Sequence, residues 1–179
     1  MHAMTEQFMH NAYAGESMAH MRYLIYADAA EKEGFKNVAR LFRAVAFAEE
    51  IHASGHMRRS PRKMGAVAAE APFGVGKTAE NLAVAVEGEK FEVEEMYPVY
   101  METAKLQGEK IAYTSFEWAY KAEKVHKKMY EEAKELVDQG KDWRDAKVQI
   151  CSTCGWTVEG EAPDVCPVCG AKSSAFRAF

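Results

Sequence analysis

The segments AFAEEIHASGH (residues 46–56) and YKAEKVHKKMY (residues 120–130) each place a histidine three residues after a glutamate. Residues three apart on a helix lie on the same face, so each Glu-x-x-His pair can bind one metal ion from a single helix. The pairs are Glu49/His52 and Glu123/His126. Both segments therefore predict a helix that carries half of a metal site.

A single glutamate precedes each pair at almost the same distance. Glu16 lies 33 residues before Glu49, and Glu89 lies 34 residues before Glu123. Inward-facing residues recur at alternating spacings of three and four, which is typical of slightly crossed helices in a bundle. Helices are expected over residues 5–33, 36–63, 79–107 and 109–139. The chain is thus predicted to be mainly α, a four-helix bundle of two similar hairpins, with a kink at Pro98.

Five glutamates occupy inward-facing positions of these helices. They are Glu16, Glu49, Glu89, Glu92 and Glu123. Five unpaired carboxylates inside a bundle would be very costly, whereas two divalent cations would leave a charge of about −1. Ordinary solvated glutamates would explain any one of them, but not five on apolar stripes with histidines one turn further on. The pattern matches the ligand arrangement of di-iron carboxylate bundles.

Glu92 has no counterpart in the first half of the chain, where Ala19 stands three residues after Glu16. Because Glu92 comes from a different helix, we expect it to face His52 and to compete with it for one cation. Imidazole suits Fe(II) and an additional carboxylate suits Fe(III). His52 and Glu92 are therefore predicted to exchange when iron changes its oxidation state.

Four more side chains near these positions give weaker signals. His56 continues the stripe one turn after His52 and is expected in the core or behind the ligands, not as a ligand. His20 is expected at a helix boundary or in solvent. Tyr23 and Tyr97 either hydrogen-bond to metal-binding carboxylates or pack as core aromatics, and the sequence alone leaves both alternatives open.

The C-terminal segment contains all four cysteines of the chain, in two Cys-x-x-Cys-Gly turns. They are Cys151, Cys154, Cys166 and Cys169. Paired turns of this kind form a tetrahedral four-thiolate site. Zinc ribbons and one-iron centres share the spacing, and iron is preferred because the bundle already implies di-iron chemistry. Trp156, Phe176 and Phe179 are expected to shield this site from water.

Length and composition limit the other possibilities. The 179 residues suit a bundle over residues 1–147 and a small metal-nucleated domain over residues 148–179, joined through the polar stretch 141–149, which we interpret as a linker. The formal net charge of −4 disfavours nucleic acid as a partner. No run approaches the roughly 20 apolar residues that span a bilayer, and no signal peptide is recognised, so a cytoplasmic protein is expected.

Several segments resemble rubrerythrin, in the order in which that family carries them. The segments are AGES (14–17), EEIHA (49–53), NLAVAVEGEKFEVEEMYP (81–98), AEKVH (122–126) and CSTCGW…CPVCG (151–170). The resemblance covers nearly the whole chain. It implies a ferritin-like bundle followed by a rubredoxin-like domain.

The resemblance also implies which residues bind iron. One iron would be held by Glu16, Glu49, Glu123 and either His52 or Glu92. The other would be held by Glu49, Glu89, Glu123 and His126. Glu49 and Glu123 would bridge the two ions. Tyr23 and Tyr97 match tyrosines that hydrogen-bond to the iron-binding carboxylates, whereas His20 and His56 have no place in the family pattern.

The activity implied by the resemblance is a non-haem peroxidase that reduces hydrogen peroxide to water in defence against oxidative stress. The iron held by the four cysteines would return electrons to the di-iron pair, supplied by a reductase or a small redox carrier. We expect the linker to hold the two sites of one chain too far apart for fast transfer. The family implies a head-to-tail homodimer in which one tail meets the other bundle, and the long middle connection would allow helices to be exchanged.

Two alternatives remain from the sequence. A ferroxidase or oxygen-reducing enzyme would use the same irons with O₂. An iron-storage protein would have a structural zinc ion in the four-cysteine tail. A nucleic-acid-binding zinc ribbon on a helical adaptor would leave the buried glutamates unexplained.

Overall fold

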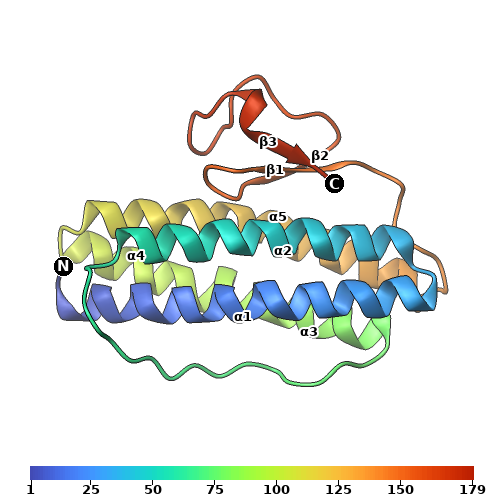
Figure 1. Cartoon of the computed structure of the whole chain (residues 1–179), viewed down its shortest axis with the longest axis horizontal. Coiled ribbons are helices and arrows are strands. Elements are labelled where there is room, and N and C mark those ends of the chain that lie inside the picture. Colours follow the sequence, from blue (N-terminus) through green and yellow to red (C-terminus); the bar gives the residue numbers. More distant parts are fainter.

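The computed structural model describes residues 1–179 as a long helical bundle with a small β domain lying on one side (Figure 1). The helices are α1 (Ala3–Glu33), α2 (Lys36–Arg59), α3 (Thr78–Phe91), α4 (Tyr97–Leu106) and α5 (Lys110–Asp138). The strands are β1 (Val148–Cys151), β2 (Thr157–Glu159) and β3 (Phe176–Ala178). The predicted four-helix bundle followed by a small cysteine domain is confirmed, with α3 and α4 together forming the third rod.

The third rod is interrupted by a π turn (Glu92–Met96) directly before Pro98. The sequence predicts a proline kink here, but the structure instead contains wider helical turns, which accommodate one additional residue. Glu16 and Tyr23 are seven residues apart, whereas Glu89 and Tyr97 are eight apart. The π turn absorbs this extra residue, so that both tyrosines reach the centre of the bundle.

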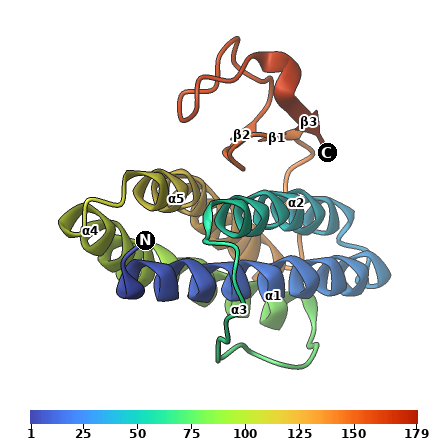
Figure 2. The same ribbon diagram turned by 60° about the vertical axis from the view of Figure 1, so that its left-hand side comes forward.

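The first hairpin closes at Gly34, whose backbone is left-handed with φ 91°. The Phe35 N–H donates a 2.9 Å hydrogen bond to the Ala30 carbonyl and so ends α1. The second hairpin closes in the same way at Gly108, with φ 71°. Residues 60–77 join the hairpins without helix or strand and run along the bundle on the side opposite the β domain (Figures 1 and 2).

The β domain is a three-stranded antiparallel sheet in the order β2-β1-β3. Val148 of β1 pairs with Glu159 of β2, and Ile150 pairs with Arg177 of β3. Figure 2 shows this domain above α2 and α5, and contacts between β1 and α2 and between β2 and α5 agree with that placement. The four-cysteine domain therefore lies on its own bundle.

The stretch before β1 is not the loose polar linker that its composition suggests. Trp143 is only 1% exposed and belongs to the main apolar core. The Asp142 carboxylate accepts hydrogen bonds from the Asn37 N–H (2.9 Å) and the Val38 N–H (3.2 Å) at the start of α2. These contacts fasten the segment to the bundle, and the acidic group suits the positive end of the helix dipole.

None of the helices combines the length and the apolar character that crossing a lipid bilayer requires.

The Asp142→Ala substitution should lower the free energy of unfolding by about 1–2 kcal/mol, because two N–H groups at the start of α2 lose their acceptor. Chemical denaturation of the metal-loaded protein, followed by circular dichroism, measures this change. Asp145→Ala is the matched control in the same segment, since that side chain is 85% exposed in its ion pair with Arg40. It should change the stability by less than about 0.5 kcal/mol, and equal effects of the two substitutions would contradict the assignment.

Candidate metal centres

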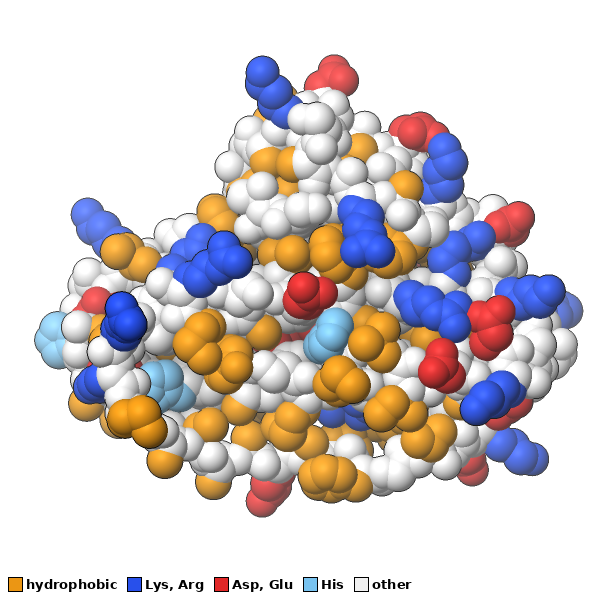
Figure 3. Space-filling view, in the orientation of Figure 1, with side chains coloured by type: hydrophobic (Ala, Val, Ile, Leu, Met, Phe, Trp, Pro, Cys, Tyr) orange, Lys and Arg blue, Asp and Glu red, His pale blue; other side chains and the backbone are white.

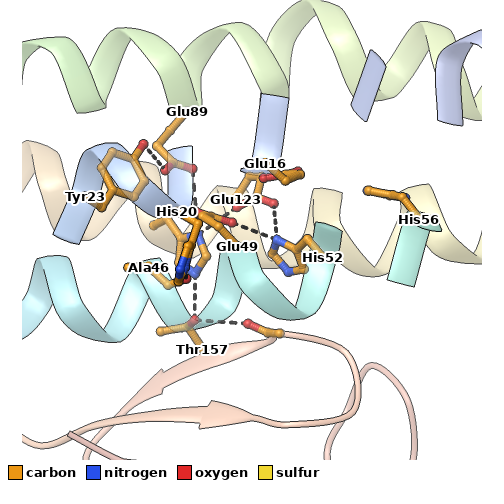
Figure 4. Close-up of polar contacts among 12 residues, drawn as sticks. Glu16, His20, Tyr23, Ala46, Glu49, His52, His56, Glu89, Glu123 and Thr157 are labelled. Atoms are coloured by element: carbon orange, nitrogen blue, oxygen red, sulfur yellow. Dashed lines mark hydrogen bonds and ion pairs between the residues drawn. The ribbon is translucent and has the colours of Figure 1, made fainter. Parts of the chain in front are cut away.

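The helices bring two groups of metal-binding side chains together in the middle of the bundle (Figure 4). The first group is Glu16, Glu49, His52 and Glu123, and the second is Glu49, Glu89, Glu123 and His126. Within each group the candidate ligand atoms all lie within 4.8 Å of one another. None of these side chains is more than 4% exposed. Glu49 and Glu123 belong to both groups, so they lie where two adjacent cations would be bridged.

Several oxygen atoms in these groups are buried without a hydrogen-bond partner. They are Glu16 Oε2, Glu49 Oε1, Glu89 Oε2 and both carboxylate oxygens of Glu123. Buried polar atoms are almost always paired, and an orphaned one costs about 1–3 kcal/mol. Two hard or borderline cations would satisfy all of these atoms at once, so the residues present fit a two-metal centre.

The protonation of the groups supports the same conclusion. Burial, reinforced by repulsion from Glu49 and Glu123, raises the pKa of Glu16 and of Glu89 well above the ordinary value. Burial lowers the pKa of His126, but the Glu123 and Glu49 carboxylates outweigh it and raise that pKa to about 10. Without cations the centre must therefore hold protons, and bound cations would replace them.

Both tyrosines whose role the sequence left open donate hydrogen bonds to these carboxylates. The Tyr23 hydroxyl donates to Glu89 Oε1 at 2.8 Å, and the Tyr97 hydroxyl donates to Glu16 Oε1. Each tyrosine thus reaches a glutamate from the other half of the chain. A single fixed hydrogen bond leaves the second oxygen of each carboxylate for a cation.

Glu92 lies outside both groups and is half-buried. Burial, then repulsion from Glu16 and Glu123, raises its pKa well above the ordinary value. His52 instead occupies the first group, with Nδ1 2.8 Å from Glu49 Oε2. The structure therefore shows the arrangement in which His52 rather than Glu92 completes the first group.

The β domain contacts the second group directly through Thr157 (Figure 4). The buried Thr157 hydroxyl lies 2.6 Å from His126 Nε2 and donates to the Gly155 carbonyl at 3.2 Å. Because its proton is used there, the hydroxyl oxygen accepts from His126 Nε2–H, which leaves Nδ1 free for a cation. Sequence reasoning missed Thr157, since no local pattern reveals where a separate domain docks.

Gly155 lies against His52 at the first group. A Cβ atom built on this glycine would overlap the imidazole ring, and its φ of 80° also favours glycine. Gly155 directly follows Cys154, so the four-cysteine site and the carboxylate site are neighbours within one chain. The expectation that the linker keeps them apart is wrong, because residues 141–147 are fastened along the bundle.

The four cysteines form a third group whose Sγ atoms lie within 4.8 Å of one another. The Sγ atoms of Cys151 and Cys169 are 3.6 Å apart, as are those of Cys154 and Cys166, and all four thiols are free. These separations suit four thiolates around one metal ion and are too long for a disulfide.

Aromatic rings cover the four-cysteine site only partly as the sequence predicts. Trp156 and Phe176 pack beside the cysteines, as expected, and Trp118 of α5 joins them from the bundle. The prediction for Phe179 is wrong, because its ring packs on Phe47 of α2 at a centroid distance of 5.6 Å. Its aromatic surface fixes the end of β3 to the bundle.

The two histidines outside the family pattern also have defined places. The prediction that His20 lies at a helix boundary or in solvent is wrong. It is half-buried between α1 and α2, and its Nδ1 lies 2.7 Å from the Ala46 carbonyl oxygen. His56 is buried behind the ligands, as expected, and belongs to neither metal-binding group.

Comparison with known proteins gives consistent results. The family model described as rubrerythrin matches residues 7–134, and the model described as the rubredoxin-like domain of rubrerythrin matches residues 149–177. The chain is 44% identical to rubrerythrin-2 of Clostridium acetobutylicum over 179 residues, covering 99% of this chain and 97% of that protein. It is 33% identical to rubrerythrin of Porphyromonas gingivalis, covering 97% and 88%. A solved structure of partially reduced nigerythrin has a TM-score of 0.84 and 30% identity, covering 100% of this chain and 88% of that one.

Substitution of a shared ligand should remove both cations from the bundle, whereas substitution of an unshared ligand should remove one. With the cysteine site filled by zinc, cobalt(II) titration should give two bound ions for the unchanged protein, one for Glu89→Ala and none for Glu49→Ala. Glu50→Ala is the matched control, because Glu50 is exposed on the same helix as Glu49. Retention of two ions by Glu49→Ala would contradict the bridging arrangement.

The Thr157→Val substitution should weaken cation binding at the second group by about tenfold, since partners that orient a ligating histidine typically contribute 10–100-fold. Competition with a chromophoric chelator measures the affinity. Thr153→Val is the control, because Thr153 is exposed in the same domain. An unchanged affinity in Thr157→Val would show that the hydroxyl does not orient His126.

Proposed function

The chain belongs to the rubrerythrin family, and from this premise we propose that it is a non-haem peroxidase that reduces hydrogen peroxide to water at the paired carboxylate–histidine groups. The observation that carries the proposal is the placement of two chemically different sites side by side. Two groups that share Glu49 and Glu123 lie in the bundle, and the four-cysteine site lies against their histidines. A site that breaks a peroxide bond must be re-reduced after each turnover, and an adjacent thiolate site suits that task.

We propose iron for all three positions. Glu16, Glu49, His52 and Glu123 would hold one ion, with Glu92 able to replace His52, and Glu89 and His126 would complete the other. Carboxylates that shift between one- and two-oxygen binding suit iron that changes oxidation state. The two irons would together supply the two electrons that cleavage of the O–O bond requires. The cysteine residues Cys151, Cys154, Cys166 and Cys169 would hold the third iron.

The side chains around the centre have separate tasks. The burial of the ligands excludes bulk water from the reaction. Tyr23 and Tyr97 hold Glu89 and Glu16 by hydrogen bonds and keep a proton beside each carboxylate. His52 would leave and Glu92 would enter as the charge of the centre increases, because the added carboxylate offsets the added positive charge.

Electrons would enter the cysteine site from a separate reductase or a small redox carrier in the cytoplasm. Cys169 is the only partly exposed cysteine of the four, whereas Cys154 is buried and is followed by Gly155, which touches His52. This supports a direction of transfer from the Cys169 side, through the sulfur site, to the bundle. Residues 148–179 would thus serve as the delivery domain and residues 1–147 as the catalytic domain.

We also propose a homodimer. Figure 3 shows hydrophobic side chains gathered on the lower part of the molecule, where α1 and the connection 60–77 lie. Among the exposed apolar side chains are Met21 (53% exposed), Ile25 (47%) and Phe73 (94%). Burial of such a patch against a second copy would be favourable, and the extended connection would permit the exchange of helices.

The fully reduced, iron-loaded protein should be reoxidised faster by hydrogen peroxide than by an equal concentration of O₂. Stopped-flow absorbance of the thiolate-bound iron measures both rates. A faster reaction with O₂ would favour an oxygen-reducing enzyme or ferroxidase instead. Cys169→Ser is the matched variant: single-turnover oxidation of the bundle irons by peroxide should persist, while repeated turnover with an external reductase should fall at least tenfold, about 1.4 kcal/mol or more.

A further inference from the structure

His56 is a fully buried ionisable residue that the proposed reaction does not use. It lies on α2 one turn after His52, and Figure 4 shows it beyond the metal-binding groups. The corresponding residue after His126 in the other half of the chain is Tyr130. An imidazole is therefore present behind the first group and absent behind the second.

His56 is the middle of a buried hydrogen-bonded chain that ends at a candidate metal ligand. Its Nδ1 lies 2.9 Å from the Ser115 hydroxyl, and its Nε2 lies 3.1 Å from the Tyr97 hydroxyl. The Tyr97 hydroxyl in turn donates to Glu16 Oε1. All four side chains are buried, so water does not compete for these bonds.

The direction of each hydrogen bond follows from the last one. Because the Tyr97 proton points to the Glu16 carboxylate, the tyrosine oxygen can only accept from His56 Nε2–H. His56 Nδ1 then carries no proton and accepts from the Ser115 hydroxyl. Only the neutral Nε2–H tautomer of His56 fits. Burial, with smaller contributions from His52 and Arg59, lowers the pKa of His56 to about 3, which agrees with a neutral ring.

We propose that His56, supported by Ser115, is a positioning residue that fixes the Tyr97 hydroxyl toward Glu16 Oε1 and so leaves Glu16 Oε2 for the cation of the first group. Glu16 Oε2 is buried and has no other partner. The inference rests on the proposed metal centre and adds residues that the family resemblance does not include.

The other half of the centre lacks this restraint. The Tyr23 hydroxyl donates to Glu89, but its ring packs against Phe42 and Tyr130 at centroid distances of 5.8 and 5.3 Å, with no histidine donating to its oxygen. The restrained carboxylate thus belongs to the group in which His52 and Glu92 are proposed to exchange. A fixed Glu16 would keep one ligand stationary while another is replaced.

The first test reads the tautomer of His56 directly. Nitrogen NMR of the zinc-loaded, full-length protein with ¹⁵N-labelled histidine should show His56 as the neutral Nε2–H tautomer at pH 7. Its signals are assigned by their loss in His56→Gln. Ser115→Ala should convert the ring to a mixture of tautomers, because Nδ1 loses its donor. A charged ring or the Nδ1–H tautomer in the unchanged protein would overturn the proposal.

The second test measures cobalt(II) affinity at the first group. His56→Leu should weaken binding by about tenfold, and His56→Gln, whose amide can still donate to Tyr97, should remain within about threefold of the unchanged protein. In a Tyr97→Phe background, His56→Leu should add less than about twofold, because the residue acts through that hydroxyl. Equal losses in both backgrounds would show a merely structural role and overturn the proposal.

These readouts remain decisive in other circumstances. Thermal unfolding followed by circular dichroism establishes that each variant is folded, and if His56→Leu does not fold, the NMR comparison with Ser115→Ala still decides. Neither measurement uses peroxide turnover. Failure of the peroxidase proposal would therefore leave the tautomer and the cobalt affinity unchanged, and the two failures can be told apart.

Discussion

The structure depends on the burial of many ionisable groups in one dry interior. Four glutamates and two histidines from four helices share a space that water does not reach. Removing a charged group from water costs several kcal/mol after relaxation, so the arrangement persists only with protons or cations among the carboxylates. Metal binding and the packing of the helices are consequently coupled, and the apolar residues around the centre determine its shape more than its stability.

The doubled sequence explains the scaffold, and its departures from symmetry explain the difference between the two metal positions. Glutamates, Glu-x-x-His pairs and tyrosines correspond between the halves. Three features do not: the extra residue in the π turn, Glu92 where the first half has Ala19, and His56 where the second half has Tyr130. All three lie near the first group, so one metal position has an alternative ligand and a restrained carboxylate, while the other retains the simpler arrangement.

Spacing along a helix allowed the sequence to predict most of this centre. Glu49 and His52 had to share a face once a helix was recognised, and the repeated 33- and 34-residue intervals paired the halves. Features that depend on distant contacts were not predictable. The polar stretch 141–149 conceals one buried tryptophan, Thr157 acquires its role only when the β domain docks, and Phe179 packs on α2 instead of on the cysteines.

The segment that contains Asp142 and Trp143 has a consequence for the way in which electrons travel. It is anchored at the start of α2, and the sheet that follows is held again at Thr157 and Phe179. A carrier domain fastened at several points does not swing between a loading and an unloading position. Electrons would instead tunnel across a short stretch of fixed protein, and the pace of that step would be set by a static separation, independent of the viscosity of the surrounding solution.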